Sequence, residues 1–280
     1  MKKGFLKKMM LLGITGIMMF SFAGCGAKND DGAKEGAKTK LEEVKNNKKL
    51  VVGMSADYAP YEFHAMIDGK DTVVGFDVEF AKEVAKDLGV ELEIKEMNFE
   101  ALLAAIQSNQ IDMIISGMNP DAEREKVVTF SDIYYEAQHG VLVNKKDLAK
   151  FETIEDLENV KVGAQIGSTQ EKITKEVIKA KDPTLMADVN NLILELKTGK
   201  MDALITEEPV AKMAIKKNPE MALAAIKFEA DGGGNAVAVK KGETELIEQV
   251  NKTIKRLVDS GELEKYIIEA NELAAENNKN

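Results

Sequence analysis

The side chains that most often carry enzymatic or metal chemistry are scarce in this chain of 280 residues. It contains one cysteine, Cys25, and two histidines, His64 and His139. A single cysteine excludes an intrachain disulfide and a multi-cysteine zinc or iron–sulfur site, and two histidines leave little for a transition metal. A nucleophilic triad would have to use one of these histidines, and we expect both on the surface or in loops. We therefore expect no catalytic residue, no cofactor and no metal.

The cysteine stands at the end of a segment with the features of an export signal. Residues 1–8 carry four lysines and no acid, and residues 9–23 form an apolar run that is shorter than the about 20 residues of a membrane-spanning helix. A basic start, a short apolar run and small residues at its end are typical of a secretory signal. The last four residues, Phe22-Ala23-Gly24-Cys25, resemble a bacterial lipobox, although that motif usually has leucine where this chain has Phe22.

These features predict a signal peptide over residues 1–24 and a lipid, such as palmitate, on Cys25. The alternative is a plain secretory signal with an incidental cysteine. Residues 26–40 contain no large apolar side chain, so residues 25–40 are predicted to form a flexible tether. The protein would then be exported and anchored to the outer face of the cytoplasmic membrane.

The charge balance is acidic, with 38 Lys+Arg against 48 Asp+Glu and a net charge of −10. Removal of the four lysines of the signal peptide would leave the exported part at −14. Nucleic-acid-binding proteins carry basic stripes, so the composition argues against nucleic acid as a partner.

Hydrophobic periodicity predicts alternating strands and helices. Residues 50–53 form a short apolar strand, and apolar residues then recur every four positions from Phe76 to Leu88, which is one face of a helix. Residues 90–94 alternate between apolar and charged side chains, as a half-buried strand does. The same reasoning predicts helices at 99–108, 169–180, 192–197 and 244–257, strands at 111–115, 160–162 and 203–205, and a frayed end over 271–280. Such alternation predicts an α/β fold with a mostly parallel sheet and helices on both faces.

A sequence pattern that repeats within the chain predicts two equivalent lobes. A shift of 90 residues places Asp112 on Asp202, and residues 114–117 on residues 204–207. Ligands of open α/β sheets bind beyond the carboxyl ends of the strands, so these two strand ends could face each other across a cleft. The alternative is that any two βα units look this similar.

Four motifs carry a resemblance to a known family. They are VVGMSADYAPYEF at 51–63, VGFDVEFAKEVA at 74–85, AIQSNQIDMIISGMNPDAEREKVVTFSDIYY at 105–135 and VGAQIGSTQE at 162–171. In this order they resemble the amino-acid-binding proteins of bacterial ABC importers, solute-binding protein family 3, which have the type II periplasmic-binding-protein fold. The resemblance implies two lobes joined by crossings near 136–139 and 232–235. Lobe 1 would comprise residues 41–137 and 233–280, and lobe 2 residues 138–232.

The resemblance also assigns residues to the parts of an α-amino acid. Arg124, one of two arginines beside 36 lysines, matches the arginine that binds the ligand carboxylate, a task suited to a planar bidentate cation. Thr169 matches a hydroxyl donor to the same carboxylate, and Glu207 matches the acid that binds the ammonium group. The positions that hold the ligand backbone from lobe 1 match Ser116, Gly117 and Asn119. Two of the matched positions depart from many relatives, which have Ser or Thr at Asn119 and Thr at Asp121; Asp121 could cap the helix that carries Arg124.

The ligand side chain would lie in a slot between Tyr58 and Phe99, which suits aliphatic stems and cations alike. Relatives for basic or amide side chains often have an acid at the position of Ser55, and this departure argues against a strictly basic ligand. Ser55, Asp57 and Gln165 together indicate a polar ligand.

The resemblance thus implies a monomeric receptor that binds a free polar amino acid and delivers it to an ABC permease. Two alternatives stay open. A dehydratase-like enzyme on the same fold could use Glu207 as a general acid if burial raised its pKa. A sensor or adhesin could bind an amino acid for a purpose other than transport.

Overall fold

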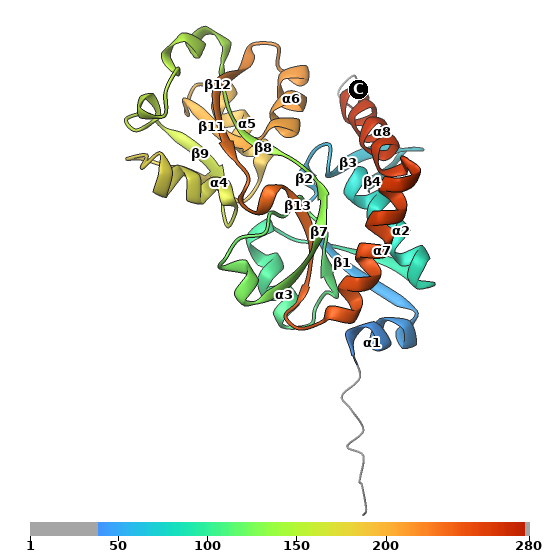
Figure 1. The fold of residues 1–280 in the computed structure, drawn as a ribbon. Helices are drawn as coiled ribbons and strands as arrows, with labels where there is room; N and C mark the ends of the chain where they lie inside the picture. Colours follow the sequence, from blue (N-terminus) through green and yellow to red (C-terminus); the bar gives the residue numbers. More distant parts are fainter. Residues whose placement is uncertain (1–38, 278–280) are drawn as a thin grey trace, which may run out of the picture. The chain divides into compact units, whose positions relative to one another are not determined.

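The computed structural model describes residues 39–277 (Figure 1). The predicted signal peptide, Cys25 and nearly all of the predicted tether lie outside the described residues. The sequence places the end of the tether at Lys40, but Lys40 already begins helix α1 (Lys40–Asn47), and the Thr39 side chain accepts the N–H of Glu42 as an N-cap. Within residues 39–277, no helix combines the length and apolar character needed to cross a membrane.

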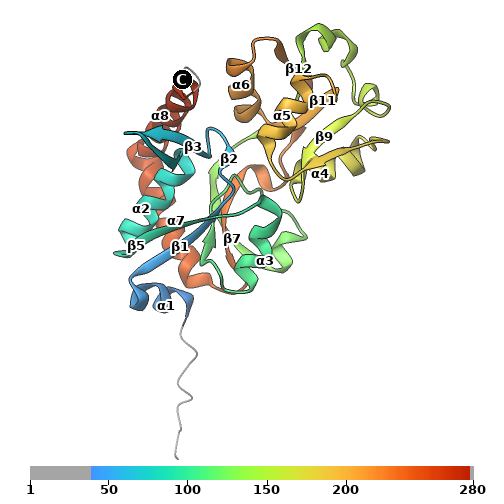
Figure 2. The same cartoon turned by 180° about the vertical axis from the view of Figure 1, so that it is seen from behind.

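Two five-stranded sheets form the framework, and we call the elements around them lobe 1 and lobe 2 (Figures 1 and 2). In each sheet four strands run in one direction and one runs against them, β13 in lobe 1 and β8 in lobe 2. The spatial order in lobe 1 is β5 (Glu91–Glu96), β1 (Lys49–Met54), β6 (Met113–Ile114), β13 (Asn235–Lys240) and β7 (Val128–Tyr135). In lobe 2 it is β10 (Thr184–Met186), β9 (Val162–Gln165), β11 (Ala203–Glu207), β8 (Gln138–Asn144) and β12 (Met221–Glu229).

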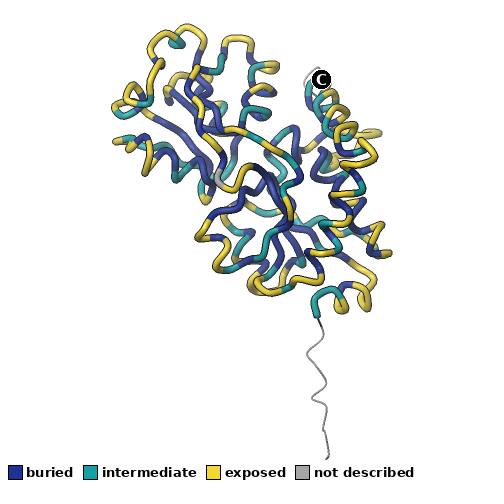
Figure 3. Tube along the Cα trace, in the orientation of Figure 1, coloured by how far each residue is buried: buried dark blue, intermediate teal, exposed yellow. Residues whose placement is uncertain are grey.

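The chain passes between the sheets twice. The first passage, residues 136–137, lies between β7 and β8, and the second, residues 230–234 with the short turn η6 (Asp231–Gly233), lies between β12 and β13. The strand that follows each passage is the antiparallel strand of its new sheet. Buried strands lie at the centre of each lobe (Figure 3), and the main core cluster of lobe 1 also includes Val189 and Val210 of lobe 2.

Amphipathic helices cover the sheets. Lobe 1 has α2 (Phe76–Leu88), η1 (Phe99–Ala101), α3 (Leu102–Gln107), η2 (Arg124–Lys126), α7 (Thr244–Ser260) and α8 (Glu262–Glu276). Lobe 2 has η3 (Lys145–Lys150), η4 (Ile154–Leu157), α4 (Thr169–Lys172), the π-turn η5 (Ile173–Val177), α5 (Val189–Lys197) and α6 (Glu208–Lys217). The mixed α/β architecture, with sheets flanked by helices, confirms the predicted fold class.

Two parts of lobe 1 differ from the sequence expectation. The expectation of a frayed end from residue 271 is wrong, because α8 runs to Glu276. Leu263 and Ala270 join the core cluster of α2 and α7, and Ala274 packs with Phe63, Ala65 and Met213. The periodicity also does not predict a third, antiparallel sheet, formed by β2 (Asp57–Tyr58), β3 (Glu62–Ile67) and β4 (Lys70–Val74). Strand β2 has only two residues, and the sequences of β3 and β4 do not alternate clearly between polar and apolar side chains.

The two lobes repeat one local interaction. Asp112, just before β6, accepts the N–H of Val51 at 2.9 Å, and Asp202, just before β11, accepts the N–H of Lys161 at 2.9 Å. Each carboxylate thus links the start of one strand to the neighbouring strand, β6 to β1 and β11 to β9. Asp112 and Asp202 are the two positions that the sequence repeat aligns. The carboxyl ends of β6 and β11 consequently occupy equivalent places in the two sheets.

Candidate functional site

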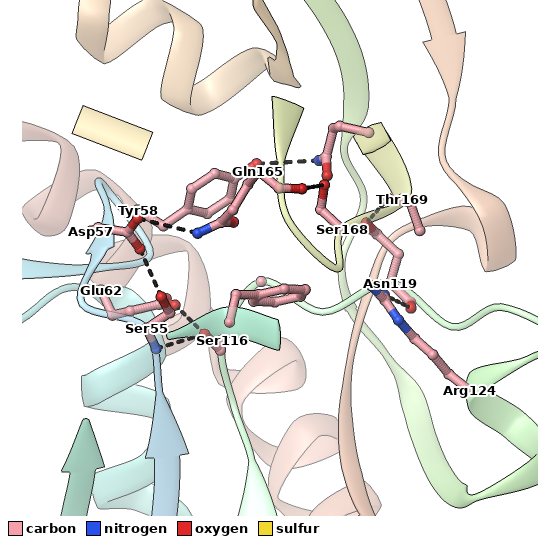
Figure 4. Close-up of a pocket in the computed structure, with 13 residues that line it drawn as sticks. Ser55, Asp57, Tyr58, Glu62, Ser116, Asn119, Arg124, Gln165, Ser168 and Thr169 are labelled. Carbon is pink, nitrogen blue, oxygen red and sulfur yellow. Dashed lines mark hydrogen bonds between the residues drawn. The ribbon is translucent and has the colours of Figure 1, made fainter. Parts of the chain in front are cut away.

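A polar cavity lies between the lobes (Figure 4). Its wall is formed from lobe 1 by Ser55, Asp57, Tyr58, Glu62, Phe99, Ser116, Gly117, Asn119 and Arg124, and from lobe 2 by Gln165, Ser168, Thr169 and Gln170. Most of these residues follow the carboxyl ends of β1, β6 and β9, where open α/β sheets bind ligands. The structure therefore brings together in one wall every residue that the sequence assigned to the ligand, except Glu207.

Arg124 is buried at one side of the cavity and is held by several acceptors. Its Nη1 donates to the Asn119 carbonyl at 2.6 Å and its Nη2 to the Gly167 carbonyl of lobe 2 at 2.9 Å. The guanidinium also lies 5.4 Å from the centre of the Phe99 ring, within the range of a cation–π contact. These contacts fix the plane of the guanidinium, which is the geometry that bidentate carboxylate recognition requires.

Asp121 positions Arg124 in the way the sequence suggested. Its Oδ1 accepts the N–H groups of Glu123 and Arg124, at 2.8 and 2.9 Å. Its Oδ2 pairs with Arg124 Nε at 3.3 Å and, across the lobes, with Lys172 at 2.9 Å. Burial alone would raise the pKa of Asp121, but the Arg124 N–H and the two cations lower it below its ordinary value. Asp121 is therefore an anion that orients the arginine from behind.

Glu207 lies behind the cavity wall, which differs from its predicted place beside the ligand. It is fully buried, and its carboxylate accepts hydrogen bonds from Asn119 Nδ2 and Asn235 Nδ2, both at 3.0 Å, and from the Tyr61 hydroxyl. Burial raises its pKa, while these donors act in the opposite direction. Asn119, which also accepts from Thr169 at 3.0 Å, stands between Glu207 and the cavity.

The next acid, Glu208, pairs with Lys212 at 2.8 Å and with Lys227 at 2.5 Å. It does not line the cavity, but its side chain is only 14% exposed, so it is a paired, partly buried acid rather than the solvated acid of the alternative interpretation. The second arginine, Arg256, is half-exposed and pairs with Glu83, Asp87 and Glu262 on lobe 1.

The opposite side of the cavity is acidic and connects the lobes (Figure 4). Asp57 Oδ1 accepts from Ser55 Oγ at 2.9 Å, and Asp57 Oδ2 accepts from Gln165 Nε2 at 3.2 Å and from the N–H of Val189 at 2.7 Å. Burial raises the pKa of Asp57 to about 6, and the nearby charge of Asp188 acts in the same direction. Asp57 is thus a lobe 1 carboxylate that meets lobe 2 at the N-terminus of α5.

Tyr58 and Phe99 both line the cavity, as the slot interpretation requires. The Tyr58 hydroxyl is within hydrogen-bonding distance of Thr206 Oγ1, 3.3 Å away, and accepts the N–H of Glu207 at 3.2 Å. Tyr58 therefore reaches from lobe 1 to the end of β11 in lobe 2. The Gly117 carbonyl, a predicted acceptor for the ligand, accepts Asn235 Nδ2 at 2.7 Å.

The sequence reasoning missed three side chains of the wall, Glu62, Ser168 and Gln170. Glu62 accepts from Ser116 Oγ at 2.5 Å, and Gln170 donates to Tyr58 at 3.4 Å. All three stand inside quoted motifs, and an acid between the aromatic residues Tyr61 and Phe63 was the available signal for Glu62.

The expectation that both histidines are on the surface is wrong for His139. It is fully buried on β8, where its Nδ1 accepts from Gln170 Nε2 at 3.1 Å. Burial, with a contribution from Arg124, lowers its pKa to about 4, so it is neutral at pH 7. His64 is exposed as expected, and hydrogen bonds to Asp71 and Glu96 raise its pKa.

Comparison with known proteins gives a consistent result. Residues 50–269 match the family model of bacterial extracellular solute-binding proteins, family 3. The chain is 39% identical over 266 residues to the arginine-binding extracellular protein ArtP of Bacillus subtilis, covering 93% of this chain and 96% of ArtP. It is 31% identical over 267 residues to the ABC transporter glutamine-binding protein GlnH of the same species, covering 93% and 94%. The crystal structure of the amino acid ABC transporter substrate-binding protein AbpA from Streptococcus pneumoniae, bound to L-arginine, aligns with a TM-score of 0.81 and 44% identity over 84% of this chain and 99% of AbpA.

Proposed function

Because the chain belongs to family 3 of the bacterial extracellular solute-binding proteins, we propose that it is the receptor of an ABC importer for a cationic amino acid, with arginine as the first candidate. The family consists of solute-binding proteins rather than enzymes, which sets the dehydratase alternative aside. The ligand would be bound between the lobes and delivered to the permease subunits.

The observation that carries this proposal is the charge arrangement of the cavity. Arg124 lies at one side, and Asp57 and Glu62 lie at the other (Figure 4). An arginine would direct its carboxylate to Arg124 and its guanidinium to the acids, with its aliphatic stem beside Tyr58 and Phe99. The presence of Ser55, where relatives for basic ligands often have an acid, had argued against a basic ligand. Asp57, which accepts a hydrogen bond from Ser55, and Glu62 would supply the negative charge from neighbouring positions instead.

The relatives support the same direction. ArtP is named as arginine-binding, and AbpA has L-arginine bound. GlnH is named as glutamine-binding, and the amides of Gln165 and Gln170 in the wall would suit a neutral amide side chain. Glutamine is therefore the second candidate.

The cellular setting is part of the proposal. A lipid on Cys25 would hold the protein, as a monomer, to the outer face of the cytoplasmic membrane after removal of residues 1–24. We also propose the lobe boundaries 41–137 with 233–280, and 138–232, with the start of lobe 1 moved to Lys40, where α1 begins. Incorporation of labelled palmitate that Cys25→Ser abolishes would support the anchor, and incorporation that survives the substitution would contradict it.

A thermal-shift screen of the twenty amino acids on the exported protein tests the ligand. A ligand at 100 times its Kd stabilises the folded state by about 2.7 kcal/mol, so arginine should raise Tm most. A shift with glutamine and none with arginine would favour the amide candidate. If no amino acid moves Tm, the receptor proposal is wrong.

A further inference from the structure

Two carboxyl groups, Glu62 of the cavity wall and Asp77, belong to segments that the hydrogen bond from the Asp77 N–H to the Tyr61 carbonyl joins at 3.0 Å, and each leaves one oxygen without a donor. Glu62 on β3 and Asp77 on α2 are both fully buried. Glu62 Oε1 accepts from Ser116 Oγ, while Asp77 Oδ2 accepts from the N–H of Gly117 at 2.8 Å and from the Tyr134 hydroxyl at 2.9 Å. Glu62 Oε2 and Asp77 Oδ1 are buried and accept from no protein donor. Two buried acceptors of this kind are stable beside each other when a proton lies between them.

The surroundings add negative charge or neutral polar groups. The titratable side chains that act on the pair are Asp57 and Tyr58 on β2, Tyr134 on β7 and Glu207 on β11. Among the cavity-lining residues that the structure describes, Arg124 is the one cation, and it lies on the other side. Full ionisation of both carboxyls would therefore place two adjacent buried charges beside further acids.

We infer that Glu62 and Asp77 share one proton in the ligand-free protein, and that a cationic ligand group entering the cavity beside Glu62 expels it. The second half rests on the proposed function. In the ligand-free state Glu62 carries the proton and donates it to Asp77, so the pair has a charge of −1. When the cation binds, the proton passes to buffer and the pair reaches −2 against the +1 of the ligand.

The direction of the pKa values agrees with this arrangement. Burial raises the pKa of Glu62 well above its ordinary value, and the charge of Asp77 raises it further. Burial raises the pKa of Asp77 to about 7, while the hydrogen bond from Glu62 acts in the opposite direction. These directions favour Glu62 over Asp77 as the residue that carries the shared proton.

The two carboxyl groups also position residues 116–117, which face the cavity after β6. Glu62 positions the Ser116 hydroxyl, which accepts the N–H of Ser55 at 3.0 Å, and Asp77 positions the N–H of Gly117. The pair thus links β1, β3, α2 and the end of β6. The pair can therefore offer a cation a second negative charge that is absent from the ligand-free protein.

Calorimetric titration of the intact exported protein with arginine at pH 7, in buffers of different ionisation enthalpy, tests the coupling. We expect release of roughly one proton per arginine bound, and an affinity that rises up to about tenfold per pH unit around pH 7. The side chain of glutamine is neutral, so glutamine binding should release no proton from Glu62 and Asp77. Arginine binding without proton release would overturn the coupling and leave the proposed function intact.

Infrared spectroscopy of the ligand-free protein tests whether Glu62 and Asp77 share a proton. This test is independent of arginine binding. The ligand-free protein at pH 7 should show the C=O band of a protonated carboxyl, and Glu62→Gln, whose amide can still donate to Asp77, should remove it. Asp77→Asn should also remove it, because the new amide donates to an ionised Glu62. Glu79→Gln, on the same helix and paired with Lys82 at 2.7 Å, is the control and should keep the band. A spectrum without the band, or a band that both Glu62→Gln and Asp77→Asn retain, would overturn the inference.

Discussion

The carboxylate of Asp57 in lobe 1 accepts the backbone N–H of Val189 in lobe 2 at 2.7 Å. Val189 is the first residue of α5, and the N-terminus of a helix carries partial positive charge and N–H groups without helical partners. The same carboxylate lines the cavity. Asp57 therefore joins two functions in one group, contact between the lobes and negative charge toward the ligand.

Replacement of Asp57 by Asn should weaken arginine binding more than glutamine binding. The substitution keeps an acceptor for Val189 but removes the charge, and a hydrogen bond to a charged group is worth about 1.5–3 kcal/mol, or roughly 10- to 150-fold in Kd. Calorimetric titration measures both ligands. Asp71→Asn, at an exposed carboxylate bonded to His64, is the control, and an equal loss for arginine and glutamine would contradict a charge-specific role.

Arginine affinity should fall as the pH is lowered through about 6. The pKa of Asp57 is raised to about 6, and the cation binds the ionised carboxylate, so protonation competes with the ligand by at most about tenfold per pH unit. The effect of Asp57 on the free energy of unfolding has the opposite sign. Because its pKa is raised in the folded protein, the unfolded chain binds fewer protons at this carboxyl than the folded protein does. The stabilisation from protonated Asp57 is therefore lost as the pH rises from about 4 to 6. Titration at several pH values should show a steeper loss of arginine affinity below pH 6 in wild type than in Asp57→Asn, which keeps only the pH dependence of the Glu62–Asp77 pair.

Arg124→Lys should weaken binding of all amino acids, by roughly 2 kcal/mol or more. A lysine ammonium is a point charge and cannot hold the Asn119 and Gly167 carbonyls while presenting a planar pair of donors. The matched control is Arg256→Lys, at the other arginine, which makes half-exposed ion pairs on lobe 1. Since the chain has no tryptophan, thermal shift or calorimetry is the suitable measurement. Wild-type affinity in Arg124→Lys would refute the assignment.

Two neighbouring acids should respond differently to amidation. Glu207→Gln turns a donor toward the groups that now donate to the carboxylate, and an unsatisfied buried partner costs about 1–3 kcal/mol. Glu208→Gln removes only ion pairs to half-exposed or exposed lysines, worth about 0–1 kcal/mol. Chemical denaturation gives the free energies of unfolding. Equal effects of the two substitutions would show that Glu207 is not the buried acceptor described.

Two adjacent glycines of the second passage between the sheets should differ in the same way. A Cβ at Gly234 would come within 2.3 Å of the Tyr135 carbonyl, whereas a Cβ at Gly233 would meet nothing within 4 Å. Both have positive φ, so Gly233→Ala should cost roughly 1–2 kcal/mol for the left-handed backbone, and Gly234→Ala clearly more. Denaturation curves of the two variants decide this, and similar curves would mean that the passage can shift to admit a side chain.

The sequence by itself determined the alternation of elements and most of the cavity wall. Periodicity of 3.6 and 2 is a local property, so it predicts helices such as α2 and α7 without any knowledge of the fold. Ser116 and Gly117 could be placed at a cleft because strand ends are where α/β folds bind ligands, whereas Asn119 was assigned through the family resemblance. Strand β2 was missed because it has only two residues, and β3 was missed because its sequence, which ends in Ala65-Met66-Ile67, does not alternate clearly.

The tertiary structure decided burial and pairing, which depend on segments distant in the chain. It placed Glu207 behind Asn119, buried His139 on β8, and brought Glu62 against Asp77. None of these relationships follows from spacing, since the desolvation and the charge that set a protonation state come from atoms of other elements. The sequence therefore identified the kinds of side chain available to a ligand, and only the fold determined which of them are charged and which face the cavity.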